Sequence, residues 1–132
     1  MKRMHVMLKV NNLNESVEFY RTLFGIEPTK RKEDYAKWML DDPRLNYSIA
    51  ERKGAKGIEH LGIEAESKEE LEELRANIDR THGLKREEGK TTCCYANSDK
   101  SWVTDPQDVA WEAFHTFGES DIYANEEQAA CC

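Results

Sequence analysis

The alternation of apolar and polar residues predicts that the chain opens with a strand followed by a helix. Residues 4–10 alternate as in a strand with one buried face, which places His5 on the face opposite Val6. Residues 13–24 repeat apolar side chains at helical spacing, and Asn12 before them is a candidate N-cap. Further strand-like runs cover residues 27–30, 35–40 and 45–51. The first half of the chain therefore predicts a strand, a helix and three strands.

The same order of elements returns in the second half. Residues 58–65 alternate like a strand, after a short linker at residues 54–57. Residues 68–82 repeat apolar positions like a helix, with His82 as a C-terminal capping residue and Gly83 as its end. Strand-like runs follow near residues 84–88, 92–96, 102–104 and 109–117.

The two halves repeat each other with one offset. An offset of 55 residues joins His5 to His60, Asn12 to Ser67 and Glu15 to Glu70. Such phased repetition is typical of a duplicated module. We therefore predict an α+β fold of two βαβββ modules, at about residues 4–52 and 57–117, within one domain over residues 1–118. One helix covers one face of each small sheet, so the opposite faces, which carry the histidines, should enclose a metal-binding cavity.

Composition and charge exclude several functions. The chain has 132 residues and a net charge of −7, with 26 acidic against 19 basic residues. Nucleic acids and anionic membranes attract basic surfaces, so we expect neither as a partner. No apolar run reaches transmembrane length, and no signal peptide follows the basic start. We predict a cytoplasmic protein with reduced cysteines.

Glu112 is a third candidate metal ligand beside His5 and His60. Apolar residues flank it on the predicted last strand, and a buried carboxylate is tolerated when it is paired or bound to metal. Two imidazoles and a carboxylate can hold iron(II) with positions open for oxygen and substrate, and the same set suits Mn(II), Ni(II), Co(II) or Zn(II). His115 lies on the opposite face of that strand, whereas Glu51 is a possible fourth ligand.

The adjacent residues Cys93 and Cys94 allow two interpretations. A disulfide between neighbours is strained, and the usual zinc pattern leaves two to four residues between its cysteines. On a turn or bulge, both sulfurs could instead close on one soft, thiophilic centre. Alternatively, the two cysteines are small core residues. Lys100 would favour the thiolate form if its ammonium lay close.

Several motifs resemble those of the vicinal oxygen chelate superfamily, which includes glyoxalases, bleomycin and fosfomycin resistance proteins and extradiol dioxygenases. Residues 14–25 are similar to its usual first helix. Over residues 4–117 the chain more closely resembles the branch of organoarsenical carbon–arsenic lyases and cadmium-inducible proteins. The motifs that carry this closer resemblance are residues 34–37, 91–96, 99–100, 102–106 and 111–112.

The resemblance implies an iron(II)-dependent dioxygenase that cleaves the carbon–arsenic bond of trivalent organoarsenicals such as methylarsonous acid. Dioxygen would be the co-substrate, arsenite would be a product, and the protein would be a monomer or homodimer. By position, His5, His60 and Glu112 would hold the metal, and Cys93 and Cys94 would hold arsenic.

Two other functions fit the same residues. A protein that only sequesters Cd(II) or As(III) needs the vicinal cysteines and no open metal site. A thiol transferase or antibiotic resistance protein would use the two histidines and the glutamate with Mn(II) or Zn(II), and its cysteines would be dispensable. Sequestration would not need dioxygen, whereas cleavage would. A thiol transferase or antibiotic resistance protein would not need the vicinal cysteines, whereas the carbon–arsenic lyase would.

Two segments depart from the resemblance. Residues 107–110 stand where many relatives have a Gly-Asn turn, which leaves the shape of that turn open. Residues 119–132 are acidic and include a second vicinal pair, Cys131-Cys132. We predict that this stretch is disordered and could capture a metalloid and pass it on.

Overall fold

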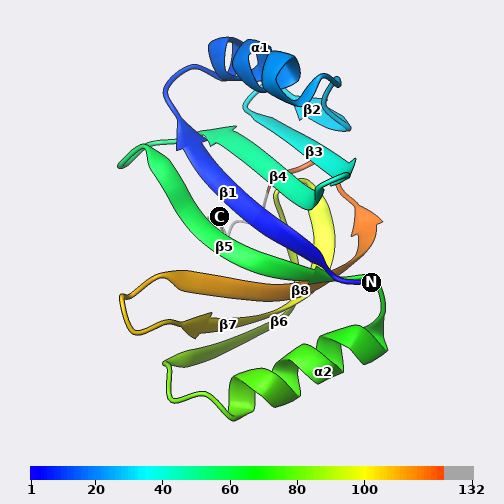
Figure 1. Cartoon of the computed structure of the whole chain (residues 1–132), viewed down its shortest axis with the longest axis vertical. Coiled ribbons are helices and arrows are strands. Elements are labelled where there is room, and N and C mark those ends of the chain that lie inside the picture. The colour runs from blue at the N-terminus through cyan, green and yellow to red at the C-terminus, as the bar shows by residue number, and fades with distance from the viewer. Residues whose placement is uncertain (124–132) are drawn as a thin grey trace. The chain divides into compact units, whose positions relative to one another are not determined.

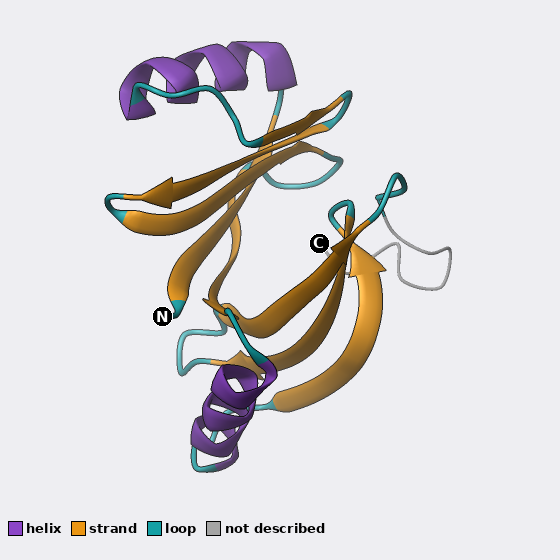
Figure 2. Ribbon diagram, turned by 90° about the vertical axis from the view of Figure 1, so that its right-hand side faces the viewer, coloured by secondary structure: helices purple, strands orange, loops and turns teal. Residues whose placement is uncertain are grey.

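The computed structural model, described here over residues 1–123, has the element order of two βαβββ modules (Figure 1). The first contains β1 (Arg3–Val10), α1 (Leu13–Phe24), β2 (Lys30–Lys32), β3 (Tyr35–Asp41) and β4 (Arg44–Glu51). The second contains β5 (Gly57–Ala65), α2 (Lys68–Asp79), β6 (Lys85–Cys93), β7 (Ala96–Thr104) and β8 (Ala110–Glu119). The predicted α+β fold with two such modules is confirmed (Figure 2).

The chain divides into two compact units. Residues 4–60 form one unit, and residues 1–3 join the unit that begins at residue 61. Strand β5 therefore begins in the first unit and ends in the second. Neither described helix has the length and apolar character needed to cross a bilayer.

In the unit of residues 4–60, one face of the sheet is covered by α1. β4 pairs parallel with β1 and antiparallel with β3, which pairs antiparallel with β2. The side chains of Val6, Leu8 and Val10 belong to the cluster under α1. Because side chains alternate along a strand, His5 faces away from this helix, as predicted. The buried members of the cluster are Val10, Leu13, Val17, Ala36, Trp38, Leu40, Tyr47 and Ile49.

In the second unit, α2 covers a smaller apolar face. β5 pairs parallel with β8, β8 pairs antiparallel with β7, and β7 pairs antiparallel with β6. The buried core residues are Ala65, Leu71, Leu74 and Ala113, packed with Ile63 and Ile78. Ala113 faces α2, so the neighbouring Glu112 points to the other face.

Both helices begin at the predicted caps. The Asn12 side chain accepts a hydrogen bond from the Glu15 N–H at 2.9 Å, and the Ser67 hydroxyl accepts one from the Glu70 N–H at 3.1 Å. These contacts satisfy N–H groups that the first turn of a helix leaves without partners. Gly25 ends α1 in the left-handed conformation, with φ 71°.

The end of the second helix was predicted wrongly. Helix α2 ends at Asp79 and is capped by Arg80, so it does not extend to His82, and Gly83 does not terminate it. Gly83 has a different reason to lack a side chain: a Cβ there would lie 2.2 Å from the Thr104 carbonyl oxygen. This close approach of two backbones was not visible in the periodicity.

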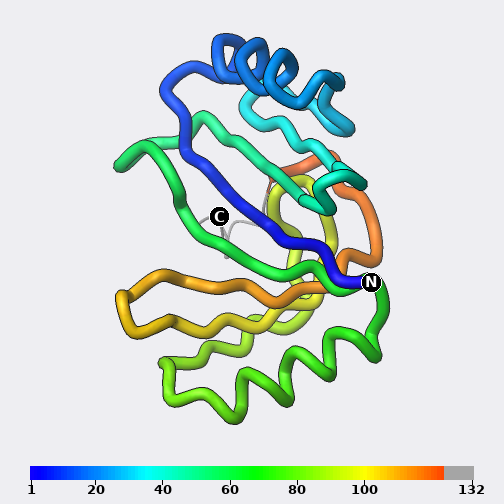
Figure 3. The backbone as a smooth tube through the Cα atoms, viewed as in Figure 1, coloured from blue at the N-terminus to red at the C-terminus, as the bar shows by residue number. Residues whose placement is uncertain are grey.

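Two strand predictions also need correction. The run at residues 27–30 is mostly loop, and β2 starts only at Lys30, where pairing with β3 begins. The runs at 84–88, 92–96 and 102–104 are parts of one long hairpin, β6–β7, traced in Figure 3. Polar residues in the middle of the hairpin hide the alternation, although the pairing of β6 with β7 continues past them with one irregularity between Glu87 and Gly89.

Candidate metal and thiol sites

His5 and His60 lie together in the unit of residues 4–60, on strands β1 and β5. Their side chains are buried, with 6% and 2% of the residue surface exposed. The two Nε2 atoms are 3.2 Å apart, and the ring planes are tilted by 50°. The two histidines that the offset of 55 residues relates therefore lie side by side.

Asn46, on β4, holds the other ring nitrogen of His5. His5 Nδ1 lies 3.1 Å from the backbone oxygen of Asn46 and 3.2 Å from its side-chain oxygen. A backbone oxygen can only accept, so Nδ1 is the protonated nitrogen and donates. The neutral ring then has its lone pair at Nε2, the atom that faces His60. This is the usual way in which a protein orients a metal-binding histidine.

The contact with Asn46 continues into a buried polar chain. Ser48 Oγ lies 3.4 Å from Asn46 Oδ1 and 2.9 Å from the Tyr35 hydroxyl. All three side chains are buried, at 2% exposure or less. Buried hydrogen-bonded chains fix side-chain orientation because an alternative rotamer would leave a polar group without a partner. Asn46 and Ser48 were missed, although two polar residues at alternate positions in an apolar strand were a visible signal.

Glu112 lies in the second unit and forms a buried ion pair with Lys100. Lys100 Nζ donates to Glu112 Oε2 at 2.9 Å, and the two side chains are 5% and 3% exposed. In the β7–β8 ladder, Lys100 is opposite Phe114 and Trp102 is opposite Glu112, so these four side chains share one face. A buried carboxylate of this kind requires a cation, which Lys100 provides here. Lys100 therefore contacts the predicted ligand Glu112.

Cys93 and Cys94 lie at the tip of the β6–β7 hairpin. Cys93 is the last residue of β6 and is paired with Ala96, so Cys94 and Tyr95 form a two-residue turn. Both turn residues have positive φ, 53° and 61°, as the commonest hairpin turn requires. The two sulfurs are 3.6 Å apart, too far for a bond between them. The turn therefore directs adjacent side chains, which a regular strand would separate, toward one point.

The other predicted candidates have structural roles. The Glu51 carboxylate accepts a hydrogen bond from the Leu13 N–H at 2.9 Å, so it stabilises the start of α1. His115 Nδ1 lies 3.2 Å from the Ala65 backbone oxygen, on the face opposite Glu112. His82 follows α2 without capping it. The structure thus gives Glu51 a helix-capping role in place of the possible ligand role that the sequence suggested.

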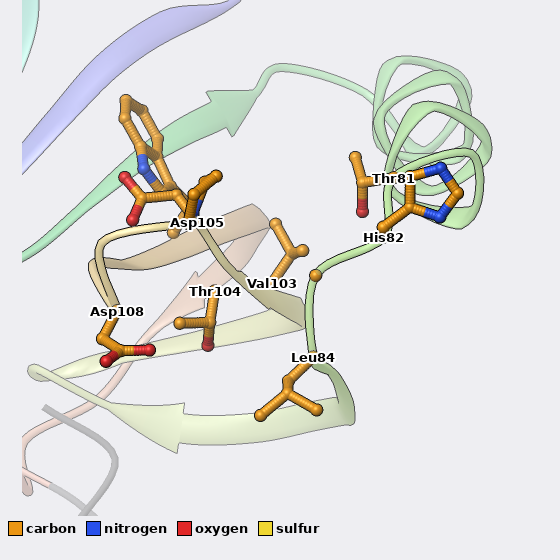
Figure 4. Close-up of a pocket in the computed structure, with 10 residues that line it drawn as sticks. Thr81, His82, Leu84, Val103, Thr104, Asp105 and Asp108 are labelled. Carbon is orange, nitrogen blue, oxygen red and sulfur yellow. The ribbon is translucent and has the colours of Figure 1, made fainter.

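An apolar pocket of about 640 Å³ opens elsewhere in the second unit (Figure 4). Thr81, His82 and Leu84 from the chain after α2 form one side of it, and the turn with Asp105 and Asp108 forms the other. Among the described residues, the predicted ligands and the vicinal cysteines are not part of its lining. The sequence had not predicted this pocket, whose lining includes Gly83 where the chain passes close to Thr104.

The turn at residues 105–109, whose shape the sequence left open, is closed by the side chain of Asp105. Asp105 Oδ1 accepts hydrogen bonds from the N–H groups of Gln107 and Val109, at 2.8 and 3.0 Å. The backbone N–H of Val109 lowers the pKa of Asp105 most, with a smaller effect from Gln107. Asp108 takes the positive φ, 66°, that glycine or asparagine adopts easily. The turn is therefore closed before β8 begins at Ala110.

The fold identifies the class of protein to which the chain belongs. The fold is similar to that of the Mn(II)-bound glyoxalase from Novosphingobium aromaticivorans, with a TM-score of 0.63 and 15% identity; the match covers 92% of this chain and 43% of that protein. The chain belongs to the glyoxalase/bleomycin resistance protein/dioxygenase superfamily, whose profile matches residues 2–113.

Curated relatives narrow the family further. The chain is 40% identical to the trivalent organoarsenical cleaving enzyme of Bacillus sp. (strain MD1) and 37% identical to the probable trivalent organoarsenical cleaving enzyme of Bacillus subtilis (strain 168). Both alignments cover 100% of this chain and 91% of the relative. It is also 32% identical to the cadmium-induced protein CadI of Mycobacterium tuberculosis, over 100% of this chain and 93% of that protein. The resemblance seen in the sequence is confirmed.

Proposed function

We propose that the protein is a metal-dependent enzyme that cleaves the carbon–arsenic bond of trivalent organoarsenicals, with dioxygen as co-substrate. The observation that carries the proposal is the hairpin turn at Cys93 and Cys94. Two thiolates that share one centre at about 2.3 Å each lie roughly 3.3–3.8 Å apart, by analogy with zinc–sulfur bonds. The separation of 3.6 Å between the sulfurs fits that range. Relatives named trivalent organoarsenical cleaving enzymes support this substrate class.

We further propose that His5, His60 and Glu112 hold one divalent metal. All three side chains are buried, and each offers one ligand atom. Two imidazole nitrogens at about 2.1 Å from one ion, at right angles, would be roughly 3 Å apart. The distance of 3.2 Å between the two Nε2 atoms fits this arrangement.

The register of β5 supports Glu112 as the third ligand. His60 lies two residues before Gly62 on β5, and Gly62 pairs with Glu112 on β8. Residues two apart on a strand face the same side, and so do paired residues on neighbouring strands. His60 and Glu112 are therefore expected on one face of the paired strands, adjacent along the diagonal.

The protein groups then have separate tasks. Iron(II) held by two histidines and one carboxylate would supply activation of dioxygen. Cys93 and Cys94 would hold arsenic by two sulfur bonds, so the third substituent, carbon, stays attached and is presented in a fixed orientation. Fixing both reactants converts an encounter between two molecules into an oriented, effectively unimolecular step. Lys100 donates a hydrogen bond to one oxygen of Glu112 and so stabilises the charge of the carboxylate that would bind the metal.

The test is aerobic incubation of iron-loaded protein with methylarsonous acid, followed by measurement of arsenite. We expect arsenite in air and none without oxygen. Cys93→Ser with Cys94→Ser should lose arsenical binding and cleavage but retain iron. Glu112→Ala should retain arsenical binding but lose iron and turnover. Iron and arsenic contents of the dialysed variants check both expectations.

Two outcomes would contradict this division of tasks. Loss of iron from the double serine variant would mean that the cysteines and the histidines form one site. Full cleavage by the same variant would mean that the cysteines are only core residues.

Sequestration of Cd(II) or As(III) is the second candidate function, because one relative is named a cadmium-induced protein. It uses the same two sulfurs and requires neither dioxygen nor a metal at the histidines. Anaerobic assay separates the two functions: a sequestering protein would still retain As(III) or Cd(II), whereas cleavage would stop. Formation of arsenite in air from methylarsonous acid would exclude sequestration as the whole function.

A further inference from the structure

The chain beyond β8 returns to the turn that carries the vicinal cysteines. The Ser120 N–H donates to the Tyr95 oxygen at 3.0 Å, and the Tyr95 N–H donates to the Tyr123 oxygen at 3.4 Å. The rings of Tyr95 and Tyr123 meet edge to face, with centroids 5.5 Å apart. Residues 120–123 are therefore held against the turn by backbone and ring contacts. The remaining residues of the predicted acidic tail, including its second vicinal cysteine pair, lie outside the described part of the chain.

This arrangement places the Tyr123 hydroxyl beside one of the two sulfurs proposed to bind arsenic. The Cys94 thiol donates to the hydroxyl oxygen, with the two heavy atoms 3.8 Å apart. Cys94 is partly exposed, whereas Cys93 has only 1% of its surface exposed. The Tyr123 hydroxyl therefore contacts the more accessible member of the pair.

A tyrosine hydroxyl interacts differently with a thiol and with a thiolate. A neutral S–H is a weak donor, whereas a hydroxyl that donates to a thiolate makes a charge-assisted hydrogen bond, roughly twice as strong as a neutral one. A hydroxyl both donates and accepts, so the Tyr123 hydroxyl can turn its hydrogen toward the sulfur once Cys94 has lost its proton. The contact therefore favours the thiolate over the thiol.

The protonation of the pair limits the capture of arsenic. The thiolate, not the thiol, is the nucleophile and the ligand, and an unperturbed cysteine is only about a few per cent thiolate at pH 7. A neighbouring hydroxyl that favours the thiolate raises the reactive fraction at this pH without itself touching arsenic. Tyr123 would act in this way through Cys94.

We propose that Tyr123 is a positioning residue for arsenic capture: its hydroxyl stabilises the Cys94 thiolate and holds that sulfur beside Cys93. The first arsenic–sulfur bond forms at Cys94, and the second closes at Cys93. Each new arsenic–sulfur bond replaces one arsenic–oxygen bond, and the hydroxide leaves as water with the proton of the thiol. Arsenic remains trivalent, so no oxidant or reductant is consumed. The inference rests on the proposed function of the two cysteines as the arsenic-binding pair.

The first test measures the rate at which iodoacetamide alkylates Cys94 between pH 6 and 9.5, with the modified residue located by tandem mass spectrometry. Tyr123→Phe keeps the ring and the backbone contacts and removes only the hydroxyl. We expect alkylation of Cys94 in this variant to be at least about threefold slower at pH 7, with the midpoint of the pH profile higher by roughly one unit. At pH 9.5, where Cys94 is mostly thiolate in both chains, the two rates should converge.

Tyr95→Phe is the matched control, because it removes the other hydroxyl of the same ring pair. It should leave the midpoint of the profile unchanged. Both variants keep the other ionisable side chains of the turn and its neighbouring segments, so these set a common baseline. The nearest of them along the chain are Lys90 on β6, Cys93, Asp99 on β7, Glu119 on β8 and Asp121.

The second test measures capture of the arsenical itself at the same sulfur. Micromolar phenylarsine oxide is added to the full-length chain, and the rate at which Cys94 becomes protected from iodoacetamide is followed. We expect protection in Tyr123→Phe to be about threefold slower at pH 7 and equally fast at pH 9.5. Protection should be complete in both chains at the end, because the variant keeps both sulfurs.

Three results would overturn the proposal. A rate ratio between Tyr123→Phe and the unchanged chain that is constant from pH 6 to 9.5 would show a structural role alone. Equal alkylation rates at pH 7 would show that the hydroxyl does not act on Cys94. An alkylation profile that shifts without any change in protection by phenylarsine oxide would show that the hydroxyl has no part in capture.

Failure of the proposed function gives a different result. A chain that cleaves no organoarsenical, but shows both the shifted profile and the slower capture in Tyr123→Phe, would keep the role of Tyr123 and refute the enzyme. A chain that cleaves methylarsonous acid, with the same alkylation profile in both forms, would keep the enzyme and refute the role of Tyr123.

Discussion

The two modules share an order of elements but differ in what holds them together. In the first, Tyr20 and Phe24 of α1 stack with ring centroids 5.6 Å apart, and both rings contact Trp38 of β3, which forms an aromatic layer between helix and sheet. In the second, leucine and isoleucine side chains of α2 pack on the alanines and isoleucine of the sheet, Ala65, Ala113 and Ile63. Aromatic residues contribute large buried areas, so the first module has the larger apolar contribution to stability.

In the second module, ion pairs and hydrogen bonds join α2 to the sheet beside a smaller apolar core. Arg75 on α2 binds Asp99 at 2.7 Å, Glu87 at 2.9 Å and the Ser101 hydroxyl at 2.8 Å. The hydrogen bond with Asp99 is the main cause of the raised pKa of Arg75. The other face of this sheet carries the buried pair of Lys100 and Glu112. Two modules with the same order of elements can therefore differ in role: the first is an apolar scaffold, and the second carries buried charges.

The largest expected effect is loss of the aromatic layer. Trp38→Ala should lower the free energy of unfolding by about 3–5 kcal/mol, because it removes a fully buried indole and leaves a cavity. Leu74→Ala, on the buried face of α2, is the comparator and should cost about 2–3 kcal/mol. Urea denaturation at pH 7 measures both. An equal or larger loss at Leu74 would contradict the view that the first module is the scaffold.

The next largest effect is expected at the buried ion pair of Lys100 and Glu112 in the second module. Lys100→Met should cost about 3 kcal/mol, because it leaves the Glu112 carboxylate buried without its cation. Adding Glu112→Gln should restore most of that loss, since no uncompensated charge then remains. Thermal unfolding of the two variants checks the pair. No recovery in the double variant would show that Lys100 acts through packing alone.

The polar chain behind His5 should have a smaller effect on stability and a clear effect on metal binding. Asn46→Ala should cost about 1–2 kcal/mol and weaken cobalt(II) binding roughly tenfold, because His5 loses one of its two orienting oxygens. Ser48→Ala, one step further from the ring, is the control and should leave metal affinity nearly unchanged. Titration with cobalt(II), followed by its visible spectrum, measures both. Unchanged affinity in the Asn46 variant would count against its orienting role.

The turn before the last strand offers a gain in stability. Asp108→Gly should raise the free energy of unfolding by about 0.5 kcal/mol, because the positive φ of 66° suits glycine better than aspartate. Gln107→Gly is the matched control within the same turn. Its φ is not positive, so glycine there should only lower stability by increasing the entropy of the unfolded chain. Chemical denaturation distinguishes a gain from a loss.

The smallest effect is a pH dependence from Asp105. Hydrogen bonds from backbone N–H groups lower its pKa in the folded protein below the unfolded value of about 3.9. The carboxylate therefore stabilises the fold above that value, and its contribution is lost as the pH falls through the lower, folded pKa. Asp105→Asn should reduce Tm at pH 7 but not at pH 2. A difference in Tm that persists at pH 2 would show that another property of the side chain is responsible.

Local patterns in the sequence determined most of the fold. Alternation and helical spacing defined both modules, and Asn12 and Ser67 marked the helix starts because capping depends only on neighbouring residues. The repeat placed His5 and His60 on equivalent faces, away from their helices. Each of these properties is decided within one turn of helix or a few residues of strand, so it can be inferred without the rest of the molecule.

Only the tertiary structure decided the properties that depend on distant partners. The β6–β7 ladder turned residues 94 and 95 into a hairpin tip, although the local pattern there favoured a strand. Pairing of β1 with β4 placed Asn46 behind His5, and pairing of β7 with β8 placed Lys100 beside Glu112. Strand register is fixed by the energy of whole ladders and buried faces, and a shift of one residue would reverse every side chain. The types of residue at the candidate sites were therefore readable from the sequence, whereas their partners depended on which strands pair.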